Sequence, residues 1–280
     1  MRKLEKPTDD AKTVFLTCIS KVKNTDLKSR LTEVADEIES LASNYDQSAA
    51  NATLNNITQD SVNSIVSNDE MKKVYEYRMA RKGQPGRHIY DKLLLMPKHG
   101  ICPLCGQRRA DTLDHHLPQA HYPFLVVTPF NLVAACSACN KSKLNKVSAQ
   151  AEKQTLHPYY DDVTTERWLY AEVIQGNPAA LRFFVQPPEN WDDVLKARLH
   201  HHFAIFELGV LYTTHAGSEL VNQKAKLELL FNRGGLEKVI EDLQDNADST
   251  NCVHKNSWQS AMYHALAESG WYCNRGFLNV

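Results

Sequence analysis

The sequence predicts a mainly α protein in which helical N- and C-terminal regions flank a central cysteine-rich segment. Apolar residues recur at helical spacing in both flanks. Two Cys-x-x-Cys pairs, Cys102/Cys105 and Cys136/Cys139, mark the centre. A chain of 280 residues can form one or two domains with a sizeable core. We expect three regions, namely residues 1–95, 96–150 and 151–280.

The N-terminal region begins with two predicted helices. Residues 11–22 have apolar side chains at helical spacing, and Asp26 is the expected N-cap of a second helix that runs to about Ser43. That second helix carries one apolar stripe, made of Leu27, Leu31, Val34, Ile38 and Leu41. The stripe either faces the core or docks a partner. Residues 44–67 are polar and predict short helices between loops.

Residues 68–82 predict a further helix, capped near Asn68 or Asp69 and ended by the turn at 83–86. Basic residues spread around its surface are Lys72, Lys73, Arg78 and Arg81. Such a helix can follow a phosphate backbone. The alternative is a surface helix whose tyrosines, Tyr75 and Tyr77, pack inward.

The C-terminal region is predicted to be helical after a short aromatic segment. Its opening residues, His157 to Asp161, either approach the central segment or form a turn that places aromatic rings in the core. The predicted helices cover residues 191–215, 219–231, 236–243 and 256–266.

The four central cysteines predict a structural zinc site. Each Cys-x-x-Cys pair can present two thiolates to one tetrahedral zinc ion. Four thiolates leave no open coordination position, so this zinc would support the fold, and any chemistry would lie between the pairs.

The order of residues in this segment resembles the four-cysteine branch of the HNH endonucleases, also called His-Me finger or ββα-metal nucleases. The pattern is Cys-x-x-Cys, Asp-His-x-x-Pro from Asp114, Asn-Leu at Asn131, and Cys-x-x-Cys-Asn-x-x-Lys ending at Lys143. The resemblance implies two short antiparallel strands and a helix, pinned by zinc. It therefore adds local α+β structure to the mainly α fold.

The resemblance also implies roles for four polar residues. His115 would be the general base that activates water, because a neutral imidazole accepts a proton at physiological pH. Asp114 and Asn140 would hold a catalytic Mg²⁺ or Mn²⁺, since hard cations prefer oxygen ligands. Asn131 would fix the loop that positions His115. His116 is the alternative base, or else lies on the opposite face of the strand.

Charge is distributed unevenly along the chain. Residues 71–150 carry 13 Lys/Arg against 4 Asp/Glu, a net +9, whereas residues 1–70 carry −4 and residues 151–280 carry −6. A polyanion would lie on the basic block, although a solvated basic face is the alternative. Besides the basic residues of 68–82, the candidate nucleic-acid contacts are Arg108, Arg109, Lys141, Lys143 and Lys146.

A second resemblance involves the flanks. The order HPYYDD, ELGVLY and NSWQSAMYHALAESGWYC is similar to the nuclease subunits of Septu-type antiphage systems, including retron-associated ones. It implies an ABC-type ATPase partner, with the acidic helical flanks as docking surfaces.

The predicted function is therefore a metal-dependent nuclease, an effector of antiphage defence, with DNA as the substrate that the family favours. An RNase effector, for example one that cleaves tRNA, could use the same site. A zinc-stabilised adaptor without catalysis is the alternative of another class, but it would need only the cysteines. The three remaining cysteines are scattered and no apolar run is long enough for a membrane span, so we expect a cytoplasmic protein.

Overall fold

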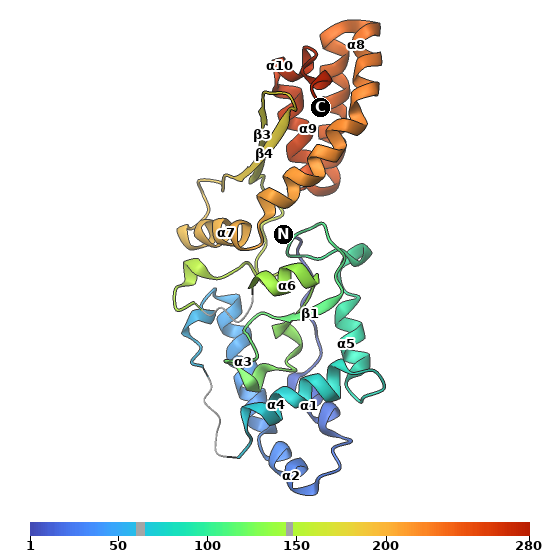
Figure 1. Ribbon diagram of the computed structural model, residues 1–280. Coiled ribbons are helices and arrows are strands. Elements are labelled where there is room, and N and C mark those ends of the chain that lie inside the picture. Colours follow the sequence, from blue (N-terminus) through green and yellow to red (C-terminus); the bar gives the residue numbers. More distant parts are fainter. Residues whose placement is uncertain (60–64, 144–147) are drawn as a thin grey trace. The chain divides into compact units, whose positions relative to one another are not determined.

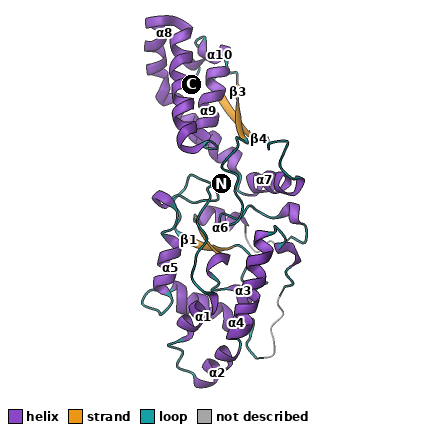
Figure 2. Ribbon diagram, turned by 180° about the vertical axis from the view of Figure 1, so that it is seen from behind, coloured by secondary structure: helices purple, strands orange, loops and turns teal. Residues whose placement is uncertain are grey.

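The computed structural model describes residues 1–59, 65–143 and 148–280, and it divides the chain into two compact units, residues 1–162 and 163–280 (Figure 1). The structure is mainly α, as predicted, and the described residues include two small two-stranded sheets (Figure 2). The expected division differs from this one, because the boundary at residue 95 falls inside the first unit. The N-terminal helices and the cysteine-rich segment therefore form one body.

Among the described residues of the first unit, five α-helices precede a strand pair and a sixth α-helix follows it. In chain order they are α1 (Ala11–Ile19), α2 (Thr25–Glu33), α3 (Ala35–Ala50), α4 (Asn68–Val74), α5 (Arg87–Leu94), β1 (Thr112–His115), β2 (Leu132–Ala135) and α6 (Ser137–Lys143). A π-helical segment, Tyr75–Ala80, continues α4.

Side-chain caps fix where these helices begin. Asn24 caps α2 by accepting a hydrogen bond of 2.9 Å from the backbone N–H of Leu27, so the cap is not Asp26, which lies in the first turn. Ser67 caps α4 in a reciprocal capping box with Glu70, one residue before the expected cap.

The predicted second helix is interrupted at Val34, where ψ is 3°. The interruption separates α2 from α3 and leaves Leu31, Val34 and Ile38 buried. The apolar stripe therefore faces the core, which was the first of its two interpretations. Further along α3, Tyr45 and Ala49 pack against Leu117, Tyr122 and Leu125 of the loop after β1.

The strand pair is short and antiparallel. Thr112 lies opposite Ala135, and His115 lies opposite Leu132. Tyr159 anchors the pair from outside the sheet, because its hydroxyl donates a 2.9 Å hydrogen bond to the Leu132 carbonyl and its ring packs on Val133.

The second unit is built on a β-hairpin and a helical hairpin. Its elements are β3 (Leu169–Ile174), β4 (Ala180–Val185), α7 (Asp193–Ile205), α8 (Leu208–His254), α9 (Trp258–Glu268) and α10 (Gly270–Cys273). β3 packs against α9 and β4 against α8. Asn256 anchors the hairpin by accepting a 2.8 Å hydrogen bond from the Trp168 backbone.

Three features of the second unit differ from the sequence-based expectation. The β3–β4 hairpin was not predicted. The expected helix 191–215 is divided between α7 and α8, since Glu207 has a φ of +51°. The expected helices 219–231 and 236–243 belong to α8, which Gly234 and Gly235 interrupt with non-helical backbone angles. In the described part of the chain, no helix is both long enough and apolar enough to cross a membrane.

Candidate active site beside a four-cysteine cluster

The four central cysteines converge in the first unit. Cys102 and Cys105 precede β1, whereas Cys136 directly precedes α6 and Cys139 lies in its first turn, and all four are buried. Their sulfur atoms lie within 4.8 Å of one another, and the Sγ atoms of Cys105 and Cys136 are 4.0 Å apart. A tetrahedral zinc with Zn–S bonds of about 2.3 Å has sulfur–sulfur edges of about 3.8 Å. The cluster could therefore hold one zinc ion.

Asp111 joins the beginning of α6 to the beginning of β1. Its carboxylate accepts hydrogen bonds from the Ser137 backbone N–H and hydroxyl, at 2.8 and 2.9 Å. Its own backbone N–H donates to the Ala135 carbonyl at 3.0 Å. Because α6 is only two turns long, these bonds and the cysteines set its direction relative to the strands.

Asn131 braces the loop that follows β1, and its side chain is completely buried. Its Oδ1 accepts a 2.8 Å hydrogen bond from the Leu117 N–H, and its Nδ2 donates to the carbonyls of Leu117 and Leu125, both at 3.2 Å. One side chain thus satisfies three buried backbone groups of the loop. The loop includes Val126, which contacts His115.

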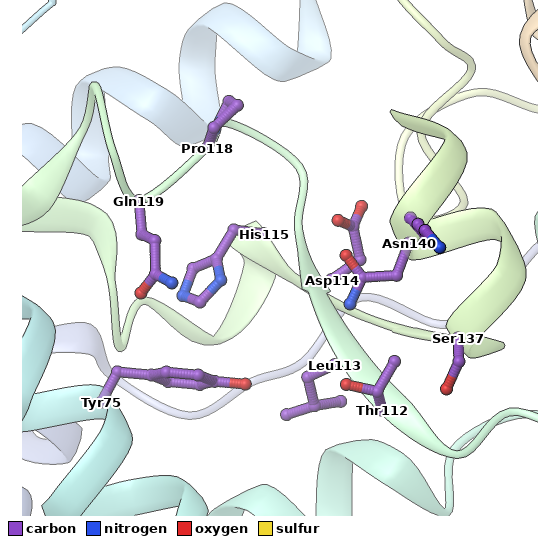
Figure 3. A pocket seen from close by; sticks show the side chains of 10 residues that line it. Tyr75, Thr112, Leu113, Asp114, His115, Pro118, Gln119, Ser137 and Asn140 are labelled. Atoms are coloured by element: carbon purple, nitrogen blue, oxygen red, sulfur yellow. The ribbon is translucent and has the colours of Figure 1, made fainter. Parts of the chain in front are cut away.

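A pocket of about 440 Å³ opens beside the end of β1. Its walls come from β1, α6, the loop after β1 and the π-helical segment (Figure 3). The lining residues are Tyr75, Thr112, Leu113, Asp114, His115, Pro118, Gln119, Ser137, Asn140 and Lys141. The predicted base and both predicted cation ligands therefore share one pocket.

His115 is held in one tautomer. Its Nε2 lies 2.9 Å from the carbonyl oxygen of Val126, and a carbonyl can only accept, so Nε2 carries the hydrogen. In the neutral ring, Nδ1 is then the basic nitrogen. Burial lowers the pKa of His115 to about 4, and the charge of Lys143 acts in the same direction, whereas the Val126 carbonyl opposes it. The imidazole is thus neutral at pH 7, with Nδ1 unprotonated, and the same burial makes it a weaker base than an exposed histidine.

Asp114 is paired with a lysine inside the protein. The Nζ of Lys143 lies 2.9 Å from Oδ2 of Asp114 and 2.5 Å from the carbonyl oxygen of His115. Burial raises the pKa of Asp114, and the Lys143 ammonium partly offsets that effect. Lys143 is 5% exposed, which differs from the surface contact with nucleic acid that we expected.

Asp114 and Asn140 offer oxygen ligands on facing elements. Asp114 belongs to β1 and Asn140 to α6, and their side chains lie close together at one side of the pocket (Figure 3). The Asn140 amide has no hydrogen-bond partner among the described residues. One carboxylate and one amide oxygen, with water completing the shell, suit Mg²⁺ or Mn²⁺. The residues present therefore fit such a cation.

His116 and His157 lie away from the pocket. Their rings pack together with centroids 4.1 Å apart, and His157 bonds to the Tyr45 hydroxyl through Nε2 at 3.0 Å. The carboxylate of Asp161 accepts a 2.6 Å hydrogen bond from the His157 N–H, which closes a turn. The structure thus agrees with His116 on the opposite face of the strand, and with residues 157–161 as a turn that places aromatic rings in the core.

Comparison with known proteins places the chain in a family. No protein-family profile matches it, and no solved structure does so. It is similar to protein Ea31 of Escherichia phage lambda, with 33% identity over 214 residues that cover 71% of this chain and 72% of the phage protein. The chain belongs to the Ea31 family. The name Ea31 states no activity.

The candidate nucleic-acid contacts of this Ea31-family chain are dispersed. Lys141 is exposed and lines the pocket, whereas Lys146 lies outside the described residues. Three of the other candidates are exposed on the first unit, namely Lys73, Arg81 and Arg109. Three are partly buried, namely Lys72, Arg78 and Arg108. Their contact with nucleic acid stays a prediction.

Two pocket residues of the Ea31-family chain were missed by sequence reasoning. The ring of Tyr75 meets the His115 ring edge to face, with centroids 4.5 Å apart and an interplanar angle of 72°. Gln119 extends toward His115 from the loop (Figure 3), and its Oε1 is buried without a hydrogen-bond partner among the described residues. Tyr75 was placed on the basic helix, and its spacing gave no signal that it would meet His115.

Proposed function

We propose that this Ea31-family protein is a metal-dependent endonuclease that hydrolyses nucleic-acid phosphodiester bonds with the chemistry of the HNH family. The observation that carries the proposal is the state of His115. It is neutral, its Nε2–H is fixed on Val126, and it shares a pocket with Asp114 and Asn140. A zinc-stabilised adaptor would need the cysteine cluster but not this arrangement.

His115 would take a proton at Nδ1 from the attacking water. The Val126 carbonyl orients the ring, and it also stabilises the imidazolium that forms, because Nε2–H keeps its acceptor. Asp114 and Asn140 would hold a divalent cation, which supplies positive charge for the phosphate and the leaving oxygen. The cysteine cluster and Asp111 hold α6 against β1, so that Asn140 stays beside Asp114.

The test is cleavage of plasmid DNA and total cellular RNA, side by side, with Mg²⁺, Mn²⁺ or EDTA. General base catalysis contributes about 10²–10⁴-fold, so His115→Ala is expected to cut at least about 100-fold more slowly than the parent. The matched control is His200→Ala, which removes an exposed imidazole on α7. DNA is the favoured substrate and RNA the alternative, and the two arms separate them.

Cleavage by His115→Ala at the parent rate would overturn the site assignment. Absence of cleavage from a folded, zinc-loaded parent on both substrates would favour the adaptor. The antiphage role and the ATPase partner rest on the resemblance of the flanks alone. They are tested by co-purification from the native host, with loss of phage resistance in a His115→Ala strain as the readout.

A further inference from the structure

Lys143 reaches Asp114 from a side that the pocket does not expose. Asp114 lines the pocket and Lys143 does not, although their charged groups are 2.9 Å apart. Each side chain is 6% exposed. A buried lysine is therefore the ion-pair partner of the carboxylate that would bind the divalent cation.

This pairing sets the charge of the candidate cation site. Asp114 and Lys143 together are neutral, and the remaining proposed ligand, Asn140, carries no charge. A divalent cation that binds here would face a nearby ammonium, and among the residues that line the pocket only Asp114, already paired, carries a negative charge. Charges in a buried environment are screened less than at the surface, so this repulsion is substantial. A phosphodiester in the pocket would supply the missing negative charge.

We propose that Lys143 is a resident counter-ion of Asp114 that keeps the divalent-cation site weak until a nucleic-acid phosphate enters the pocket. The inference rests on the proposed function for the identity of that ligand. Metal and nucleic acid then bind cooperatively, and each raises the affinity for the other by the same factor. Lys143 makes a second contact, with the His115 carbonyl, which would hold the ammonium beside Asp114 when a metal binds.

The chain offers a matched control in the first unit. Lys153 carries the same charge as Lys143, but it is exposed and does not line the pocket. Water and salt screen its charge. The Lys153→Gln substitution removes one positive charge from the surface and should leave metal affinity nearly unchanged, whereas Lys143→Gln removes the buried charge and keeps a hydrogen-bond donor for Asp114.

The experiment measures Mn²⁺ binding by electron paramagnetic resonance in zinc-loaded chains that all carry His115→Ala, which keeps nucleic acid intact. The affinity of each chain for Mn²⁺ is determined without nucleic acid, with a short DNA duplex and with tRNA. The Mn²⁺ bound by the nucleic acid itself is subtracted. In the background chain, one of the two polymers should raise Mn²⁺ affinity at least about tenfold. With Lys143→Gln added, affinity without nucleic acid should already be at least about tenfold higher, and the coupling should fall to about threefold or less.

A folded Lys143→Gln chain with unchanged or weaker Mn²⁺ affinity would overturn the inference. If the Lys143→Gln chain does not fold, the inference is tested with the background chain alone. Mn²⁺ affinity that changes with neither DNA nor tRNA in that chain would also overturn the inference. Failure of the proposed function is distinct, since it is read from cleavage by the parent. If an Asp114→Asn chain bound Mn²⁺ as tightly as the background chain, Asp114 would not be a ligand of the cation. The proposed function and the inference about Lys143 both depend on that ligand and would both fail.

Discussion

Replacement of Asn131 by alanine should strongly destabilise the first unit. The substitution removes three hydrogen bonds and leaves the N–H and the carbonyl of Leu117 buried without partners, whereas the Leu125 carbonyl keeps the Thr128 N–H. An unsatisfied buried group costs about 1–3 kcal/mol. Because the loop can relax and admit water, we expect a loss of about 2–4 kcal/mol rather than the full sum for two groups. The exposed Asn44 provides the control, since Asn44→Ala should change stability by less than about 0.5 kcal/mol.

The two units can be followed separately during urea unfolding. All four tryptophans, Trp168, Trp191, Trp258 and Trp271, belong to the second unit. Their fluorescence reports on that unit, whereas far-ultraviolet circular dichroism reports on both. An unfolding transition that appears in circular dichroism but not in tryptophan fluorescence therefore belongs to the first unit. The change in the free energy of unfolding is taken from that transition. A loss below about 1 kcal/mol would refute the bracing role of Asn131.

Two further predictions concern the cysteine cluster and His115. Cys136→Ser should lower bound zinc, measured by atomic absorption, and should make the first unit less stable, because structural zinc contributes to folding free energy; unchanged zinc content would contradict the cluster. Burial lowers the pKa of His115 to about 4, so the unfolded chain binds a proton from about pH 6.5 downward while the folded chain does not. Stability should therefore be fully present above pH 6.5 and fall as the pH drops toward 4, by up to about 3 kcal/mol, relative to a His115→Gln variant. Equal pH profiles for the two proteins, in urea unfolding at each pH, would refute this assignment.

Local signals in the sequence were sufficient for the parts of the site that depend on spacing. The two Cys-x-x-Cys pairs predicted a cluster that the structure brings together. Asp114, His115 and Asn140 were selected by the resemblance to the HNH motif rather than by spacing alone, and they line one pocket. The reason is that each belongs to a short segment fixed by its neighbours, two at the end of β1 and one directly after a cluster cysteine.

Other features depend on tertiary packing and had no local signal. Lys143 was read as a surface cation because lysine is rarely buried, and only the approach of α6 to β1 provides its partner. Tyr75 meets His115 because the π-helical segment packs beside the strand end. The break at Val34 lies within a continuous helical pattern.

The β3–β4 hairpin did have a signal that was missed. Residues 169–174 and 180–185 are rich in β-branched and aromatic side chains, and they are separated by a segment that contains Gly176, Asn177 and Pro178. That pattern is typical of two strands joined by a turn. Cross-strand pairs such as Tyr170 with Phe184, whose rings stack with centroids 6.0 Å apart, stabilise the hairpin.

The central claim is that the His115 imidazole is the base of a metal-dependent nuclease. Its most direct test is chemical rescue of His115→Gly with free imidazole, followed as the initial rate of plasmid and RNA cleavage in Mg²⁺. The proposal predicts that the variant is inactive alone, that imidazole restores metal-dependent cleavage, and that Asp114→Ala is not rescued. Parent-like cleavage by His115→Gly without imidazole would contradict the claim.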